Sequence, residues 1–152
     1  MKRIILIAFI LFATFVSGAG APSGSIRRFI DNKLVHSCYE IDNEYLLYGY
    51  VLPLFYENKV YAPAWFNNDA LSNNGYVLLN YIRQVDQHGL LPNDYHLYLI
   101  EKYLGKMFSD TLMDKEDMMK LDVLLTDAFM LLGSHLYYGK VDQEKEGANW
   151  KI

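Results

Sequence analysis

A long stretch with apolar residues at helical intervals, from about Lys115 to Tyr138, constrains this chain more than any other feature. The spacing places one set of side chains along a single helix face: Met118, Leu121, Leu125, Ala128, Leu132 and Leu136. Asp114 is the expected N-cap, and Gly139 fits a C-terminal stop. The sequence therefore predicts one long helix with this face buried. Gly133 inside it is expected to allow close approach of another segment.

Shorter segments show the same periodicity. Ser25 is the expected cap of a first helix, whose apolar face comprises Ile26, Phe29, Ile30 and Leu34. A second helix is predicted over Glu44–Tyr56, with Leu47, Val51, Leu54 and Phe55 on one face. Pro53 should kink this helix or begin a new turn there, because proline removes a backbone donor.

Two further helices are expected to pack as antiparallel neighbours, because only about four residues connect them. The first begins at Asp69 or Ser72 and ends at Gly89, a residue suited to the left-handed conformation. Its buried stripe comprises Leu78, Leu79, Ile82 and Val85. The second follows Pro92, with Asn93 or Asp94 as its cap and Leu97, Ile100 and Leu104 in its core face.

An extended loop is predicted over Asn58–Asn68. Ala62 precedes Pro63 and is therefore biased toward extended geometry. Trp65 is expected to fill the core from this loop, with its indole N–H bonded to backbone. Together these patterns predict a mainly α protein, a single compact domain of about four to six helices with little or no sheet.

The N-terminus has the pattern of a secretory signal peptide. Lys2 and Arg3 precede the apolar run Ile4–Val16, and small residues for cleavage follow up to Ala21. We therefore expect residues 1–21 to be removed and residues 22–152 to form the exported domain, in the periplasm or cell envelope. The apolar run is short for a membrane span, so no span is expected after cleavage. A retained N-terminal anchor is the alternative.

Charge and cysteine content exclude some partners and one kind of covalent cross-link. The chain has 14 basic and 18 acidic residues, and removal of Lys2 and Arg3 leaves 12 basic against the same 18 acidic. This balance argues against nucleic acid as a partner. Cys38 is the only cysteine, so an internal disulfide is excluded. The 13 Tyr residues fit an aromatic-rich core and rim, or alternatively a surface on which sugar rings stack.

No catalytic or metal-binding pattern is evident in the sequence. His36 and Cys38 lie two residues apart, but they lack a glycine-rich turn, and a structural thiol is the preferred interpretation. His88, His96 and His135 show no ligand spacing, and the latter two occur within predicted apolar helices. Three acidic residues have local structural interpretations instead of a catalytic one: Asp94 as a cap, Asp127 as a partner of another segment, and Asp142 as a loop residue. We therefore expect no catalytic, cofactor-binding or metal-ligating residue.

Several short motifs occur in a fixed order along the chain. The first is Phe55-Tyr56, followed by Tyr61-x-Pro63-x-Trp65, and the second contains Gly89-Leu90-x-Pro92-x-Asp94-Tyr95. The third contains Asp127, His135 and Gly139, and Trp150-x-Ile152 follows it. This ordered set resembles the scaffold domain of YcbB-type murein L,D-transpeptidases, over roughly Ile26 to Ile152.

The resemblance implies a protein of peptidoglycan remodelling. Family members join this scaffold to a peptidoglycan-binding module and to a catalytic domain that cross-links neighbouring peptide stems. Their catalytic cysteine lies in a Ser-x-Gly-Cys-x-Arg motif, which this sequence lacks. The chain is thus expected to be a non-catalytic scaffold domain, truncated or stand-alone, whose natural partner is a catalytic domain. The alternatives are a peptidoglycan- or carbohydrate-binding module, and a partner in trans of a separate catalytic domain.

Overall fold

A computed structural model describes residues 23–36, 39–108 and 114–140 of the chain. Its elements, in chain order, are α2 (Ser23–His36), β1 (Glu40–Ile41), β2 (Glu44–Tyr45), α3 (Leu52–Asn58), β3 (Phe66–Asn67), β4 (Ala70–Leu71), α4 (Asn73–Arg83), the 3₁₀ turns η2 (Val85–His88) and η3 (Pro92–Tyr95), α5 (Leu97–Phe108) and α6 (Lys115–Tyr138). Within the described residues, five α-helices and two short hairpins confirm the mainly α prediction.

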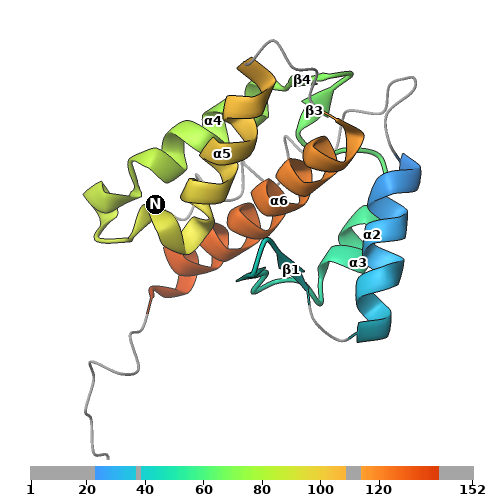
Figure 1. Cartoon of the computed structure of the whole chain (residues 1–152). Coiled ribbons are helices and arrows are strands. Elements are labelled where there is room, and N and C mark those ends of the chain that lie inside the picture. The colour runs from blue at the N-terminus through green and yellow to red at the C-terminus, as the bar shows by residue number, and fades with distance from the viewer. Residues whose placement is uncertain (1–22, 37–38, 109–113, 141–152) are drawn as a thin grey trace, which may run out of the picture.

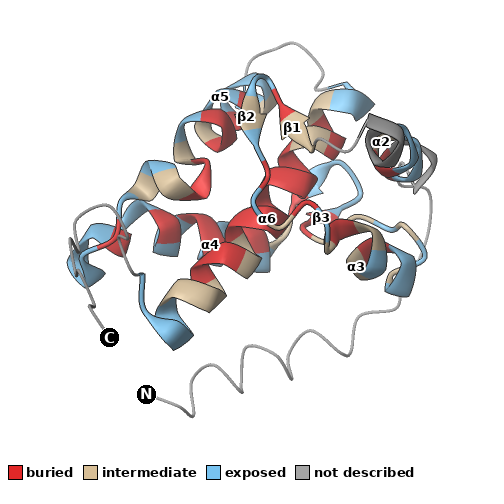
Figure 2. Ribbon diagram, turned by 90° about the horizontal axis from the view of Figure 1, so that it is seen from below, coloured by how far each residue is buried: buried red, intermediate tan, exposed pale blue. Residues whose placement is uncertain are grey.

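Helix α6 forms the centre of the molecule. Figure 1 shows it between α4 and α5 on one side and α2 and α3 on the other, and it contacts all four helices. Every residue from Leu121 to Ala128 is buried, so the middle of α6 is enclosed on all sides. Figure 2 shows this burial along α6 and in the adjoining part of α4. The long helix predicted from the sequence is therefore the core element of the fold.

The predicted ends of α6 are confirmed. Asp114 caps the helix, and its Oδ1 accepts the Asp117 N–H at 2.7 Å. Gly139 follows the last turn with φ +84°, and its N–H donates to the His135 carbonyl oxygen at 2.9 Å. The expected close approach at Gly133 is not found among the described residues, where no atom of another segment lies within 4 Å of a Cβ placed there.

Helices α4 and α5 also follow the sequence pattern. Ser72 caps α4 by accepting the Gly75 N–H at 3.2 Å. The predicted stripe of α4 and η2 is buried, and Gly89 ends this segment with φ +73°. Figure 1 shows α4 and α5 running in opposite directions, and the two helices are in contact. The predicted cap of α5 is wrong, because Asp94 lies within η3 and not directly before the helix.

The predicted helix over Glu44–Tyr56 is largely wrong. Residues 44 and 45 form β2, turns follow, and the helix begins only at Leu52, with Pro53 in its first turn. Leu47 and Leu54, expected in the buried face, are 59% and 62% exposed. A proline near a helix start costs no hydrogen bond, because the first N–H groups have no intrahelical partner. Of the two outcomes predicted for Pro53, the beginning of a new helical turn is confirmed and a kink is not.

Two short antiparallel hairpins form where no strand was predicted. Strands β1 and β2 pair Glu40 with Tyr45, and the turn between them has positive φ at Asp42 and Asn43. Strands β3 and β4 pair Phe66 with Leu71, so the predicted loop is interrupted near its end. In α2, Ile26 and Ile30 are buried as expected, but Ser25 lies inside the helix and does not cap it.

Several expectations fall on residues that the structure does not describe. These are the signal peptide, Cys38, Asp142 and the stretch around Trp150. Among the helices that the structure does describe, none combines the length and the apolar character needed to cross a bilayer.

Candidate functional site

Three polar side chains are fully buried on α6. Asp122, Thr126 and Asp127 each have 0% exposure, in a helix whose other central residues are apolar. A buried carboxylate is costly unless hydrogen bonds replace the water that it has lost. These three residues are here named the α6 polar cluster. Their hydrogen-bond partners show what the cluster does.

Asp122 binds the loop that enters β3. Its Oδ2 accepts the N–H groups of Ala64 and Trp65, both at 2.9 Å. Its Oδ1 accepts the Tyr56 hydroxyl at 2.7 Å. One carboxylate thus fixes two consecutive backbone amides and the last part of α3. The extended geometry that Pro63 favours brings these amides to the helix.

Thr126 completes this contact one turn later on α6. Its Oγ1 accepts the indole N–H of Trp65 at 2.9 Å and lies 2.7 Å from the Tyr56 Oη. Trp65 fills the core from its loop as the sequence predicts, with 2% exposure. The expected backbone partner of its N–H is wrong, since the acceptor is the Thr126 hydroxyl. A side-chain acceptor on the central helix pairs the indole N–H and also fixes the position of the ring.

Asp127 binds a second, separate segment. Its Oδ1 accepts the Tyr48 N–H at 2.6 Å, and its Oδ2 accepts the Leu47 N–H at 3.2 Å. Its Oδ2 also contacts the His96 Nε2 at 2.8 Å. The predicted bond from Asp127 to another segment is therefore confirmed. The two carboxylates of α6 together hold the loop before β3 and the turn after β2.

His96 joins three elements through its ring. Its Nε2 faces Asp127 of α6, and its Nδ1 makes a short contact with Glu44 of β2. The side chain is 3% exposed, and its backbone has φ +61°, a strained value for a residue with a side chain. The prediction that His96 lies within a helix is wrong, because it separates η3 from α5. Burial lowers the pKa of His96, but the hydrogen bonds that its ring makes to Asp127 and Glu44 outweigh burial and raise the pKa overall.

The electrostatics of Asp122 differ from those of His96. Burial raises the pKa of Asp122 to about 6, against the hydrogen bonds from Ala64, Tyr56 and Trp65, which lower it. Burial also raises the pKa of the Tyr56 hydroxyl, and the nearby Asp122 carboxylate adds to the increase. The raised pKa values favour the protonated form of each group, so the Tyr56 hydroxyl stays a hydrogen-bond donor.

The polar atoms of the α6 polar cluster bind other segments of the same protein. A general base needs a lone pair directed at a substrate proton. The Asp122 and Asp127 oxygens face backbone N–H groups, and both His96 nitrogens face carboxylates. The side chains of Asp122, Asp127 and His96 are buried, and that of Glu44 is half-buried. The described residues of the cluster thus use their polar atoms within the protein.

A second polar group lies at the C-terminal end of α6. The Tyr95 hydroxyl is 2.8 Å from the His135 Nδ1, and Lys140 Nζ is 2.5 Å from the Asp94 Oδ2. Burial and the nearby Lys140 charge lower the pKa of His135, which favours its neutral form. These contacts attach η3 to the end of α6.

The structure brings the predicted motif residues together in two places. Tyr56, Trp65 and Asp127 belong to the α6 polar cluster or contact it, with Phe55, Tyr61 and Pro63 nearer the surface. Asp94, Tyr95 and His135 meet at the end of α6, with Gly139 just beyond the helix. Gly89, Leu90 and Pro92 shape the connection between η2 and η3 without joining either polar group.

Sequence reasoning missed four residues of these contacts: Glu44, His96, Asp122 and Thr126. Asp122 and Thr126 lie four apart within an apolar helix, the spacing of neighbours on one face. A carboxylate in such a run was a usable signal. Glu44 and His96 gave none, because their pairing spans 52 positions.

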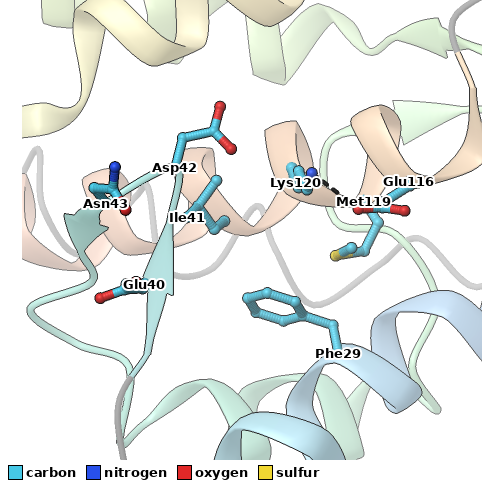
Figure 3. Close-up of a pocket in the computed structure, with 8 residues that line it drawn as sticks. All are labelled: Phe29, Glu40, Ile41, Asp42, Asn43, Glu116, Met119 and Lys120. Carbon is cyan, nitrogen blue, oxygen red and sulfur yellow. Dashed lines mark ion pairs between the residues drawn. The ribbon is translucent and has the colours of Figure 1, made fainter.

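An open pocket of about 300 Å³ lies away from the polar cluster (Figure 3). It is lined by Phe29, Glu40, Ile41, Asp42, Asn43, Glu116, Met119 and Lys120. Lys120 pairs with Glu116 at 2.9 Å, and Asp42 accepts from Lys102 and Tyr103. These hydrogen bonds lower the pKa of Asp42. The charged groups named here are therefore engaged with one another or with neighbouring side chains.

Across the described ranges, no group of three or more His, Cys, Asp or Glu side chains is arranged to hold a metal ion. His36 ends α2, while Cys38 lies outside the described residues, so its interpretation as a structural thiol stays a prediction.

Comparison with models of protein families identifies the family of this chain. The family model described as Scaffold domain, which is the scaffold domain of YcbB-type L,D-transpeptidases, matches residues 51–152. The chain belongs to this scaffold-domain family. Curated proteins and solved structures gave no match. The matched range begins just before α3 and includes both carboxylates of the α6 polar cluster and the contacts at the end of α6.

Proposed function

We propose that this chain is a non-catalytic scaffold domain that supports an L,D-transpeptidase catalytic domain during peptidoglycan cross-linking outside the cytoplasm. The family match over residues 51–152 is the observation that carries the proposal. The catalytic domain is supplied either in the same polypeptide or by a separate chain acting in trans. Export rests on the signal-peptide pattern of residues 1–21.

The internal chemistry of the domain supports a mechanical role. The buried carboxylates of Asp122 and Asp127 are used to hold backbone segments against α6. Such an arrangement fixes loops on a rigid helix, which is what a supporting domain needs in order to present a defined surface to its neighbour. It supplies no nucleophile with an activated base.

Two measurements test this proposal. The purified chain is incubated with peptidoglycan oligomers that carry tetrapeptide stems, and the products are analysed by mass spectrometry. We expect no new cross-links, and their appearance would refute a non-catalytic role. The chain is also mixed with a separately produced catalytic domain of the family, and sedimentation measures complex formation. Failure to associate, both in trans and when the two are fused, would contradict the supporting role.

Wall binding is the alternative, and exposed aromatic side chains favour it. Tyr50, Tyr98 and Tyr138 are 74%, 71% and 79% exposed, as sugar stacking requires. The test is co-sedimentation with insoluble sacculi. Retention that is lost when these three residues are changed to Ser, but kept in the Leu54→Ser control, would favour wall binding. Leu54 is a suitable control because it is exposed to a similar degree, at 62%, but is not aromatic.

A further inference from the structure

The Glu44–His96–Asp127 contact is asymmetric. Asp127 has 0% side-chain exposure and is also bonded to the Leu47 and Tyr48 amides. Glu44 has 34% side-chain exposure and sits on the short strand β2. One carboxylate is therefore fixed in the core, whereas the other can turn toward water.

The arrangement requires a protonated ring. Each ring nitrogen faces a carboxylate, and a carboxylate can only accept a hydrogen bond. Neutral imidazole has one N–H and one lone pair, so one of the two contacts would place a lone pair against a negative oxygen. The geometry is thus satisfied by imidazolium and by neither neutral tautomer.

We propose that Glu44, His96 and Asp127 form a proton-dependent latch that holds the β1–β2 hairpin against α5 and α6. When His96 gives its proton to solvent, the remaining N–H stays on Nε2 and keeps its bond to Asp127. The Nδ1 lone pair then faces the Glu44 carboxylate, which turns out to solvent. The hairpin loses its attachment to His96, while α6 keeps the Leu47 and Tyr48 amides.

The other titratable groups on the elements next to the His96 ring either pair with other residues or face solvent. In η3, Asp94 pairs with Lys140 and the Tyr95 hydroxyl contacts His135. At the start of α5, Tyr98 is 71% exposed. Glu44 of β2 and Asp127 of α6 are the groups whose charge acts on the ring, and both raise its pKa. The latch therefore opens on the alkaline side of an ordinary histidine.

The first test is a histidine titration of the full chain by NMR, with the His96 signals assigned through a His96→Asn variant. His135 serves as the internal reference, because burial lowers its pKa. We expect His96 to lose its proton at a higher pH than His135. Loss at the same pH or lower would overturn the latch.

The second test is amide hydrogen exchange of Leu46, whose N–H donates to the Tyr39 carbonyl oxygen at 2.9 Å, corrected for the intrinsic effect of pH. Protection should fall roughly tenfold as His96 deprotonates, as expected for the loss of one charge-assisted hydrogen bond. In Glu44→Gln this fall should disappear, because an amide can accept from an N–H or donate to a lone pair. Protection that does not change in the wild-type chain would overturn the proposal.

A matched control separates the latch from general charge effects. Glu101 pairs with Arg83 at 2.7 Å and is 42% exposed, so Glu101→Gln also removes one paired carboxylate. This variant should keep both the His96 titration and the pH-dependent fall in protection. If Glu101→Gln removes the fall as Glu44→Gln does, the effect is not specific to the latch and the proposal fails.

Discussion

Asp122 holds more of the structure than its single side chain would indicate. It accepts from Tyr56, Ala64 and Trp65, so one carboxylate satisfies three donors that are otherwise shielded from water. Removing an acceptor leaves each buried donor unpaired, at about 1–3 kcal/mol per group. A domain of this size has only about 5–15 kcal/mol of total stability.

We therefore expect Asp122→Ala to lower the free energy of unfolding by at least about 2 kcal/mol, because the Ala64 and Trp65 amides lose their acceptor while Tyr56 keeps Thr126. Urea denaturation followed by circular dichroism measures this change. Asp69→Ala is the control, since Asp69 is exposed in the turn between β3 and β4. Equal midpoints for the two variants would contradict the role assigned to Asp122.

The raised pKa of Asp122 also makes stability depend on pH. Its pKa rises from 3.8 to about 6 on folding, so the folded protein binds this proton more tightly than the unfolded chain does. The resulting stabilisation is fully present below pH 3.8 and is lost as the pH rises through about 6. Two pKa units correspond to about 3 kcal/mol. The raised pKa of His96 acts in the same direction.

Denaturation series at several pH values test this expectation. Between about pH 4 and pH 7, the unfolding free energy should fall more steeply with pH in the wild-type chain than in Asp122→Asn, which cannot titrate at this position. The comparison of slopes removes the contributions of other groups. Parallel slopes in the two proteins would show that Asp122 is ionised over the whole range.

At the scale of elements, the helices with local signals were predictable from sequence. Helices α4 and α6 carry both a regular apolar interval and a capping residue, Ser72 or Asp114, and both elements formed as expected. The segment before α3 also has helical spacing, yet it forms a strand and turns. The Leu47 and Tyr48 amides bind Asp127 some 80 positions away, and no local pattern reports such a partner.

Substitution by alanine should change stability in opposite directions at two glycines. A Cβ at Gly49 would lie 2.4 Å from the Tyr39 Cβ, which is fixed to the backbone and cannot turn away. At Gly133, inside α6, a Cβ would meet no other atom within 4 Å. Gly49→Ala should therefore cost about 1–3 kcal/mol through overpacking. Gly133→Ala should stabilise the protein by up to about 1 kcal/mol through helix propensity.

Thermal unfolding of the two variants beside the wild-type chain gives the measurement. The midpoint should fall for Gly49→Ala and rise for Gly133→Ala. A rise for Gly49→Ala would mean that Tyr39 and residue 49 move apart without a cost in stability. A fall for Gly133→Ala would mean that another segment covers this face of α6.

At the scale of the whole molecule, stability should be graded outward from α6. This helix touches α2, α3, α4 and α5, so its middle cannot open without separating the two sides of the fold. The β1–β2 hairpin has only two residues in each strand and lies nearer the surface. Amides in the centre of α6 should therefore exchange only by global unfolding, whereas hairpin amides should exchange through local opening.

Native-state hydrogen exchange at increasing low denaturant concentrations distinguishes these classes. The amides of Leu124 and Leu125 should show the largest opening free energy and the steepest denaturant dependence. Those of Ile41 and Leu46 should show smaller values that hardly change with denaturant. If α6 exchanges before α4, the central helix does not organise the fold.

Asp122 and Asp127 hold their segments mainly through main-chain N–H groups at Ala64, Trp65, Leu47 and Tyr48. An amide is the same whatever side chain accompanies it, apart from proline. The side chains at 47 and 64 are thus free to diverge among homologues, while the two aspartates are not. Loops of foreign sequence could be grafted at both places, provided that each offers two successive amides to the helix.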